Sequence, residues 1–158
     1  MSTPAERYAA AAARNRRERS ELARFTASLE FPLDDFQVRA CEAVELGKGV
    51  LVAAPTGAGK TMVGATGRKA FYTTPVKALS NQKFHDLVRV HGAANVGLLT
   101  GDSSVNGEAP IVVMTTEVLR NMMYAGSRTL EGLGYVVMDE VHYLADRFRG
   151  AVWEEVII

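Results

Sequence analysis

The stretch that decides the fold is Ala54-Pro55-Thr56-Gly57-Ala58-Gly59-Lys60-Thr61, which directly follows a short apolar run at residues 50–54. It has the pattern of a phosphate-binding loop (Walker A), G-x-x-x-x-G-K-[ST], with Ala54 in place of the first glycine. Alanine is compatible with this loop because the first position needs only a small side chain. A plain turn between a strand and a helix needs glycine, but it does not need Gly-Lys-Thr at this offset.

Each part of the stretch has a chemical role. Gly57 and Gly59 let the backbone curl so that its N–H groups point at one phosphate. Lys60 places a cation on the β- and γ-phosphate oxygens, and the Thr61 hydroxyl can ligate Mg²⁺. The helix expected to begin here adds the positive end of its dipole. The predicted nucleotide-binding residues are Pro55, Thr56, Gly57, Ala58, Gly59, Lys60 and Thr61.

A second motif lies at the end of the apolar run at residues 135–138, where Asp139 and Glu140 follow. A carboxylate at the tip of a core strand is costly unless it meets a cation or water. Asp139 is therefore predicted to hold Mg²⁺, and Glu140 to orient and deprotonate the attacking water. The alternative is that the pair only caps the next helix. Together with the phosphate loop, the pair predicts hydrolysis of Mg-ATP, with Lys60, Asp139 and Glu140 as catalytic residues.

The pattern of apolar runs predicts an α/β fold. The runs are short, rich in β-branched residues and not alternating in polarity, which is typical of strands buried on both faces. Helical patterns separate them, and strands joined by helices predict right-handed crossovers and a mainly parallel sheet. In such sheets ligands bind at the carboxyl ends of the strands. The predicted strands are residues 50–54, 70–73, 96–99, 111–114 and 135–138.

The amino-terminal part predicts a helical arm. Thr3-Pro4-Ala5-Glu6 has the pattern of a capped helix start, and a second helix is expected at residues 35–46, ended by Gly47. Residues 1–24 hold six arginines and three glutamates, within a chain of zero net charge. Such an arm can contact phosphates, although a solvated helix face is the alternative. We expect a basic helical arm at residues 1–30 and one domain at residues 31–158.

Composition narrows the class of protein. The 158 residues argue for one domain. The single cysteine, Cys41, cannot form an internal disulfide, and the amino terminus lacks the apolar core of a signal peptide. No apolar run approaches the ~20 residues that a membrane span needs. We therefore expect a soluble, cytoplasmic protein without membrane contact.

With these motifs in order, the chain resembles the first RecA-like domain of superfamily-two DEVH-box helicases. Within them it resembles the superkiller-type RNA helicases, particularly the bacterial members. The resemblance covers about residues 29–158. It rests on the glutamine motif at 36–37, the phosphate loop, the segments 74–82, 100–102 and 115–117, and Asp139-Glu140-Val141-His142.

The resemblance implies roles for further residues. Gln37 is expected to read the adenine edge, for which its donor and acceptor amide is suited. His142 is expected to face a second RecA-like domain and to couple hydrolysis to movement, whereas a helix-start residue is the bland alternative. Trp153 is expected in the core. The loops expected to grip the backbone of one nucleic-acid strand supply Pro75, Lys77, Asn81, Thr100, Gly101, Thr115, Thr116 and Glu117.

For each of these loop residues a helix cap is the alternative, and Thr115 or Thr116 is expected to be one as well. The implied function is the ATP-binding domain of an ATP-dependent RNA helicase, a RecA-like P-loop NTPase that uses ATP and Mg²⁺. Its expected partners are single-stranded RNA and a second RecA-like domain. A DNA helicase stays open, because no residue stands out as a reader of the 2′-hydroxyl. A truncated ATP- or RNA-binding module without turnover is the other alternative.

Two departures from the family pattern favour that last alternative. Only Met62 to Arg68 separate the phosphate loop from the next strand, so a helix of about six residues rises ~9 Å. The helix must return over the length of a strand, which spans ~17–20 Å, so it is too short. Either residues are absent here or a deletion weakens the anchor of the loop. The family's motif III, second domain and arginine finger are expected beyond Ile158, and the isolated chain is then weakly active or inactive.

Overall fold

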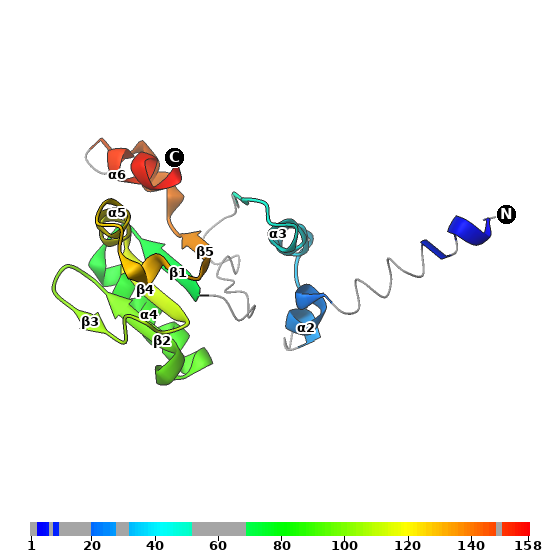
Figure 1. The fold of residues 1–158 in the computed structure, drawn as a ribbon, viewed down its shortest axis with the longest axis horizontal. Coiled ribbons are helices and arrows are strands. Elements are labelled where there is room, and N and C mark those ends of the chain that lie inside the picture. The colour runs from blue at the N-terminus through cyan, green and yellow to red at the C-terminus, as the bar shows by residue number, and fades with distance from the viewer. Residues whose placement is uncertain (1–2, 7, 10–19, 28–31, 52–68, 148–149) are drawn as a thin grey trace. The chain divides into compact units, whose positions relative to one another are not determined.

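The structure is a computed structural model, shown in Figure 1. It describes residues 3–6, 8–9, 20–27, 32–51, 69–147 and 150–158. The chain divides into two compact units, residues 1–66 and residues 67–158, which are described separately. The phosphate loop and residues 62–68 lie outside the described residues. No helix in the described ranges combines the length and the apolar character that a membrane span requires.

The first unit begins with the predicted helix start. The Thr3 amide donates to Glu6 Oε2 at 2.7 Å, and the Glu6 amide donates to Thr3 Oγ1 at 3.2 Å. This reciprocal pair is a capping box, as the sequence predicted. Helix α2 (Glu21–Ala27) has a start of its own, where Ser20 Oγ accepts from the Ala23 amide at 3.0 Å.

Helix α3 (Asp35–Glu45) confirms the predicted second helix. Gly47 follows it with φ +71, a left-handed conformation that glycine adopts without steric cost. Helices α2 and α3 are joined by a hydrogen bond from the Leu22 amide to Glu45 Oε1 at 2.7 Å. These contacts stay within residues 1–66.

The second unit is built on a five-stranded sheet with the order β3-β2-β4-β1-β5. Every neighbouring pair is parallel except β2 and β3, which are antiparallel. The predicted α/β fold with a mainly parallel sheet is confirmed. Strand β3 was not expected, because two residues are too few for a hydrophobic period. The strands are β1 (Lys69–Thr74), β2 (Val96–Leu99), β3 (Ser104–Val105), β4 (Ile111–Thr115) and β5 (Leu133–Met138).

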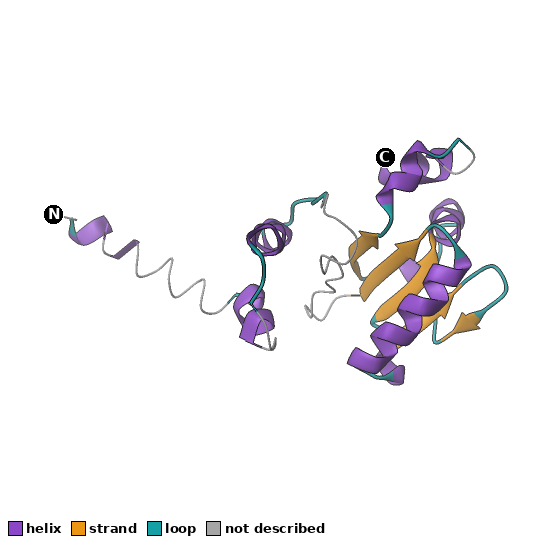
Figure 2. Cartoon of the chain, turned by 180° about the vertical axis from the view of Figure 1, so that it is seen from behind, coloured by secondary structure: helices purple, strands orange, loops and turns teal. Residues whose placement is uncertain are grey.

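Helices cover the sheet, as the crossovers require. Figure 2 shows α4 (Lys77–His91) lying across the sheet, where it contacts β1, β2 and β4. Helix α5 (Thr116–Tyr124) contacts β1 and β4, and α6 (Gly150–Ile157) packs against α5. Short 3-10 turns complete the unit at η1 (Ala93–Asn95), η2 (Arg128–Leu130) and η3 (Val141–Ala145).

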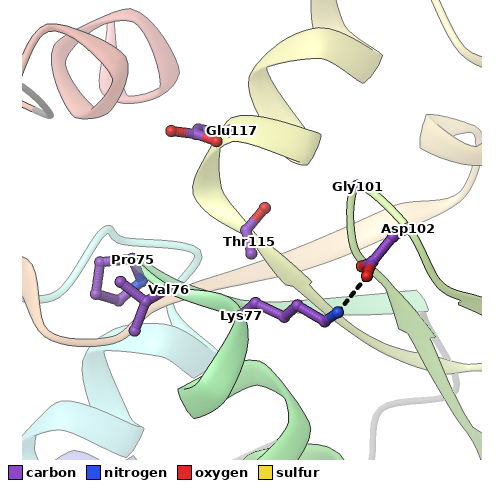
Figure 3. Close-up of a pocket in the computed structure, with 7 residues that line it drawn as sticks. All are labelled: Pro75, Val76, Lys77, Gly101, Asp102, Thr115 and Glu117. Atoms are coloured by element: carbon purple, nitrogen blue, oxygen red, sulfur yellow. Dashed lines mark hydrogen bonds and ion pairs between the residues drawn. The ribbon is translucent and has the colours of Figure 1, made fainter.

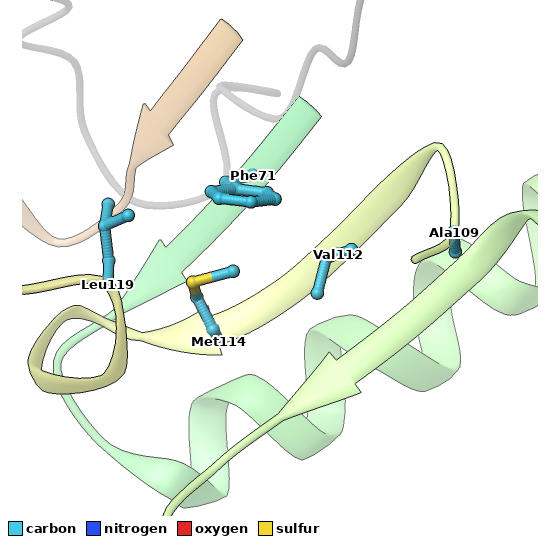
Figure 4. Packing of buried hydrophobic residues seen from close by; sticks show 5 residues of the cluster. All are labelled: Phe71, Ala109, Val112, Met114 and Leu119. Carbon is cyan, nitrogen blue, oxygen red and sulfur yellow. The ribbon is translucent and has the colours of Figure 1, made fainter. Parts of the chain in front are cut away.

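One core cluster of this unit lies between the sheet and α5. Figure 4 shows its central cluster, in which each side chain is at most 3% exposed. Burial of one large apolar side chain contributes about 1.5–3 kcal/mol. Trp153 of α6 is 1% exposed, which confirms the expectation that it is a core residue. The cluster consists of Phe71, Ala109, Val112, Met114 and Leu119.

Two predictions about strands are wrong in part. Val50 and Leu51 lie outside any strand and are 38% and 77% exposed, because no described strand pairs with them. The rest of that predicted strand, residues 52–54, lies outside the described residues. Strand β5 is half-buried rather than buried on both faces, and Val136 is 42% exposed. The reason is its place at the end of the described strand order, where only β1 pairs with it.

We expect Phe71→Ala to lower the free energy of unfolding by about 3–5 kcal/mol, because the ring is fully buried and leaves a cavity in the cluster. Val90→Ala is the matched control, since Val90 is 74% exposed and its truncation should cost less than about 0.5 kcal/mol. Urea unfolding followed by circular dichroism measures both. Equal losses in the two variants would contradict this core assignment.

Candidate functional site

The parallel register brings several loops to one edge of the sheet. Thr73 of β1 pairs with Met114 of β4 and with Met138 of β5. The residues that follow these positions therefore emerge side by side at the carboxyl ends of the strands. Asp139 follows β5, and its amide donates to the Thr73 carbonyl at 2.9 Å, which continues the ladder by one residue.

The Asp139 carboxylate is held on both of its oxygens. The buried Tyr72 hydroxyl donates to Asp139 Oδ2 at 2.6 Å, and the Glu140 amide donates to Oδ1 at 2.9 Å. Lys83 Nζ lies 4.0 Å from Oδ2. The side chains of Asp139 and Lys83 are 21% and 27% exposed. A half-buried carboxylate thus has two donors and a cation as neighbours, and sequence reasoning did not identify Tyr72 or Lys83.

Glu140 has a left-handed backbone, with φ 59 and ψ 43. A residue other than glycine in this region costs on the order of 1–3 kcal/mol, and such residues cluster at functional sites. His142 Nδ1 lies 3.2 Å from Glu140 Oε2. The structure therefore places His142 beside the predicted catalytic glutamate. Its predicted role in coupling two domains stays a prediction.

Magnesium fits this place as part of a nucleotide complex. Mg²⁺ commonly uses one or two protein carboxylates, with phosphate oxygens and waters completing its shell. Asp139 supplies one carboxylate, and the described residues contain no cluster of three or more His, Cys, Asp or Glu that would form a separate metal cage. Thr61, the other predicted ligand, and Lys60 lie outside the described residues. Their approach to Asp139 stays a prediction.

Gln37 has a structural partner in α3. Its Oε1 accepts a hydrogen bond from the Asp34 amide at 2.8 Å, which is the second half of a capping box at the start of this helix. Sequence reasoning missed this contact, although the Asp34-x-x-Gln37 spacing is its signal. Recognition of adenine by Gln37 stays a prediction.

A pocket of about 380 Å³, shown in Figure 3, opens at the carboxyl ends of β1, β2 and β4. Asp139 follows β5 at the same edge of the sheet. Lys77 and Asp102 form an ion pair across it, and Thr100 Oγ1 donates to Asp102 Oδ1 at 3.0 Å. Helices α4 and α5 both begin here, so their first N–H groups lack partners within the helix. The pocket is lined by Pro75, Val76, Lys77, Gly101, Asp102, Thr115 and Glu117.

Five of the eight residues predicted to bind a strand line this pocket: Pro75, Lys77, Gly101, Thr115 and Glu117. Thr100 adjoins it through Asp102. Asn81 and Thr116 are not among the lining residues. Sequence reasoning did not single out Val76 or Asp102 as lining residues.

Two threonines of this set have structural partners. Thr115 is the N-cap of α5 and accepts from the Val118 amide at 3.4 Å, so the expected helix cap is confirmed. Thr116 is only 2% exposed, and its hydroxyl donates to the Thr74 carbonyl at 3.3 Å. Thr116 therefore ties the start of α5 to the end of β1 beneath the pocket.

Buried hydroxyl groups form a hydrogen-bond network beneath the pocket. Thr74 Oγ1 and Ser80 Oγ lie 2.7 Å apart, and Thr74 also donates to the Val76 carbonyl at 3.0 Å. Thr74 and Ser80 are both fully buried. A buried hydroxyl without a partner costs about 1–3 kcal/mol, so this network fixes the ends of β1, α4 and α5 relative to one another.

The comparisons identify the family. The DEAD/DEAH box helicase model matches residues 34–158, and the chain belongs to this family. It is 68% identical over 149 residues to "Probable helicase HelY" of Mycobacterium tuberculosis H37Rv, covering 89% of this chain and 16% of that protein. It is 52% identical over 143 residues to "DExH-box ATP-dependent RNA helicase DExH15 chloroplastic" of Arabidopsis thaliana (82% and 12%). It is 47% identical over 139 residues to "Antiviral helicase SKI2" of Saccharomyces cerevisiae (83% and 11%).

The chain is much shorter than these relatives, and it is also slightly shorter than the stretches that match it. The chain spans 16% or less of each of these three relatives. The match to the mycobacterial protein runs over 149 positions, whereas 89% of 158 residues is about 141. This chain therefore has about eight fewer residues than the matched stretch. The same difference holds against the yeast protein, where 139 positions compare with 83% of 158, or about 131.

We expect Lys77→Met to raise the pKa of Asp102. The Lys77 ammonium, and after it the Thr100 hydroxyl, donates to the Asp102 carboxylate and holds its pKa below the ordinary 3.8. Because the pKa is lowered in the folded state, this contribution to stability is present above the unfolded pKa and is lost as pH falls through the folded one. Carbon-13 NMR titration of the carboxyl groups measures the shift.

Glu108 provides the internal control for this titration. The Lys69 ammonium and then the Thr129 hydroxyl lower its pKa, and Lys69 begins β1 at the sheet edge opposite the pocket. Its pKa should be the same in both proteins. An unchanged Asp102 pKa in the Lys77→Met variant would contradict the ion pair.

Proposed function

We propose that this chain is the first RecA-like domain of a DEVH-box, superkiller-type helicase, which couples hydrolysis of Mg-ATP to movement along single-stranded RNA. One observation carries the proposal. Asp139 and Glu140 lie at the same sheet edge as the pocket lined by Lys77 and Thr115. Loops at one edge can thus bind both a nucleotide and a nucleic-acid strand. Membership of the DEAD/DEAH box helicase family supports it.

The nucleotide half of the proposal assigns roles to this chain's residues. Lys60 and the backbone N–H groups of residues 56–61 bind the phosphates in a loop that opens with Pro55, and Thr61 and Asp139 hold Mg²⁺. When bound, Mg²⁺ neutralises the charge that develops on the phosphate oxygens. Glu140 orients the attacking water and takes its proton. Its left-handed backbone directs it away from the line of β5, next to His142.

Gln37 and His142 complete this half of the proposal. Gln37 contacts adenine through the amide group that also takes part in the capping box. His142 transmits the state of Glu140 to a second RecA-like domain, and its contact with Glu140 supports this role. The proposal also places the protein in the cytoplasm.

The strand half of the proposal places a phosphate of the RNA backbone in the pocket. Lys77 offers a cation, and the starts of α4 and α5 offer N–H groups and positive dipole ends. Asp102 and Glu117 put two carboxylates in the same pocket, so each phosphate is held weakly and can be released. RNA is favoured over DNA because the plant relative is named an RNA helicase.

A second candidate function is a binding module that grips nucleotide or RNA without turnover. The short segment after the phosphate loop favours it. In the sequence only residues 62–68 separate Thr61 from Lys69, and eight helical steps rise about 12 Å. The six residues of β1 span about 17 Å between the sheet edge that would face the phosphate loop and the opposite edge. A helix built from these seven residues would therefore be too short to return over that length.

We expect Lys77→Gln to weaken binding of a fluorescein-labelled, unstructured single-stranded RNA to the 158-residue chain. Loss of one phosphate contact should lower the slope of log K against log salt by about 0.7. Arg89→Gln is the matched control, because it removes the same charge from the last turn of the same helix at a side chain that is 79% exposed. Fluorescence anisotropy at several salt concentrations gives the slopes. Equal slopes in the two variants would contradict strand binding at the pocket, and tighter binding of DNA of the same sequence would contradict the choice of RNA.

Titration with Mg-ATP separates the two candidate functions. Lys60→Met should weaken nucleotide binding, because the cation on the phosphates is lost. Glu140→Gln should keep binding but reduce turnover about 10²–10⁴-fold in the protein that contains a second domain. Calorimetry and phosphate release measure these quantities. Wild-type binding no tighter than that of Lys60→Met would contradict the nucleotide site, and brisk turnover by the 158-residue chain would exclude the module without turnover.

A further inference from the structure

The surroundings of Asp139 contain a cation and a hydroxyl that the proposed hydrolysis does not use. Tyr72 is 2% exposed and its hydroxyl donates to Asp139 Oδ2 at 2.6 Å. Lys83 Nζ lies 4.0 Å from the same oxygen and 5.7 Å from the centre of the Tyr72 ring. The three side chains come from three elements: β1, α4 and the residue that follows β5.

Packing alone does not account for this group. Tyr72 lies on a strand that alternates faces, so its neighbour Phe71 enters the core cluster and Tyr72 points to the opposite face. A buried tyrosine needs a partner for its hydroxyl, and here the partner is the carboxylate that the proposed function assigns to Mg²⁺. The Lys83 side chain is only 27% exposed where it approaches this carboxylate. Pointing into solvent instead would spare its ammonium any loss of hydration.

We propose that Tyr72 and Lys83 are positioning residues for Asp139. Tyr72 fixes the orientation of the carboxylate, and Lys83 balances its charge in the metal-free protein. With a nucleotide bound, Asp139 would hold the divalent cation, which would supply the positive charge that Lys83 supplies in the metal-free protein. This exchange of cations rests on the proposed function, whereas the metal-free contact does not.

The metal-free contact is tested by a double-mutant cycle of Lys83→Met and Asp139→Asn in the 158-residue chain. Without Lys83 the half-buried Asp139 carboxylate loses the cation that pairs with it among the described residues. Lys83→Met should therefore destabilise the wild-type chain more than it destabilises the chain that already carries Asp139→Asn. We expect the two effects to differ by about 3- to 10-fold in the unfolding equilibrium constant, measured by urea unfolding.

Lys77→Met with Asp139→Asn is the matched control cycle. Lys77 is on the same helix but pairs with Asp102, so this cycle should be additive. Additive effects of Lys83→Met and Asp139→Asn would overturn the positioning role of Lys83. This result does not depend on whether the chain binds nucleotide.

The exchange of cations is tested by titrating Mn²⁺ into the chain with a non-hydrolysable ATP analogue, and by reading free Mn²⁺ from its electron paramagnetic resonance signal. Lys83→Met should tighten Mn²⁺ binding by about 3- to 10-fold, because a competing cation is gone. Tyr72→Phe should weaken it, because the carboxylate loses its orienting donor. A merely structural role would weaken binding in both variants, and this result would overturn the exchange.

The Asp139→Asn variant distinguishes a failure of the proposed function from a failure of the exchange of cations. If this variant binds Mn²⁺ as well as the wild type does, the metal role of Asp139 in the proposed function is wrong and the exchange falls with it. The double-mutant cycle then still decides the positioning role. If Asp139→Asn weakens Mn²⁺ binding but Lys83→Met has no effect, only the exchange is overturned.

Discussion

The parallel pairing of β1 with β4 and β5 is the constraint on which the rest of the structure depends. Parallel strands need crossover connections, so β1, β4 and β5 all end at the same edge of the sheet, and the loops that follow them begin there. The register places Thr74 opposite Thr115, and Asp139 one residue beyond the partner of Thr73. Residues separated by more than sixty positions in sequence thereby become neighbours.

Polar groups accumulate at this edge, and each has a reason to be there. Thr74, Ser80 and Thr116 are buried hydroxyls whose hydrogen bonds tie the strand end to the starts of two helices. Such a network is costly unless each member is bonded, and once bonded it holds a single geometry. Above it, Lys77 and Asp102 face each other in the pocket, and Asp139 stands beside Tyr72 and Lys83. The edge therefore combines a rigid base with charges that are paired within the protein and accessible to a ligand.

The sequence predicted four strands of the second unit well, because short β-branched runs stand out between helical periods. Residues 96–99 have the predicted bounds, and β1, β4 and β5 differ from their predictions by at most two residues at either end. The exposure of Leu51 and Val136 was not predicted, since an apolar run does not reveal whether a strand pairs beside it. The contacts of Asp139 with Tyr72 and Lys83 depend on register and helix placement, which no local pattern contains. The capping box of Gln37 is different, because its spacing was readable.

The central claim is that the phosphate loop and Asp139 meet around one metal-nucleotide complex. Paramagnetic broadening of backbone amide signals by Mn²⁺ bound with an ATP analogue tests it most directly. The account predicts strong broadening at residues 139–141, beyond the end of β5, and little at Lys69 and Leu133, which begin β1 and β5 at the opposite edge. Broadening centred on Lys69 and Leu133, or none at residues 139–141 while the complex is bound, would contradict it.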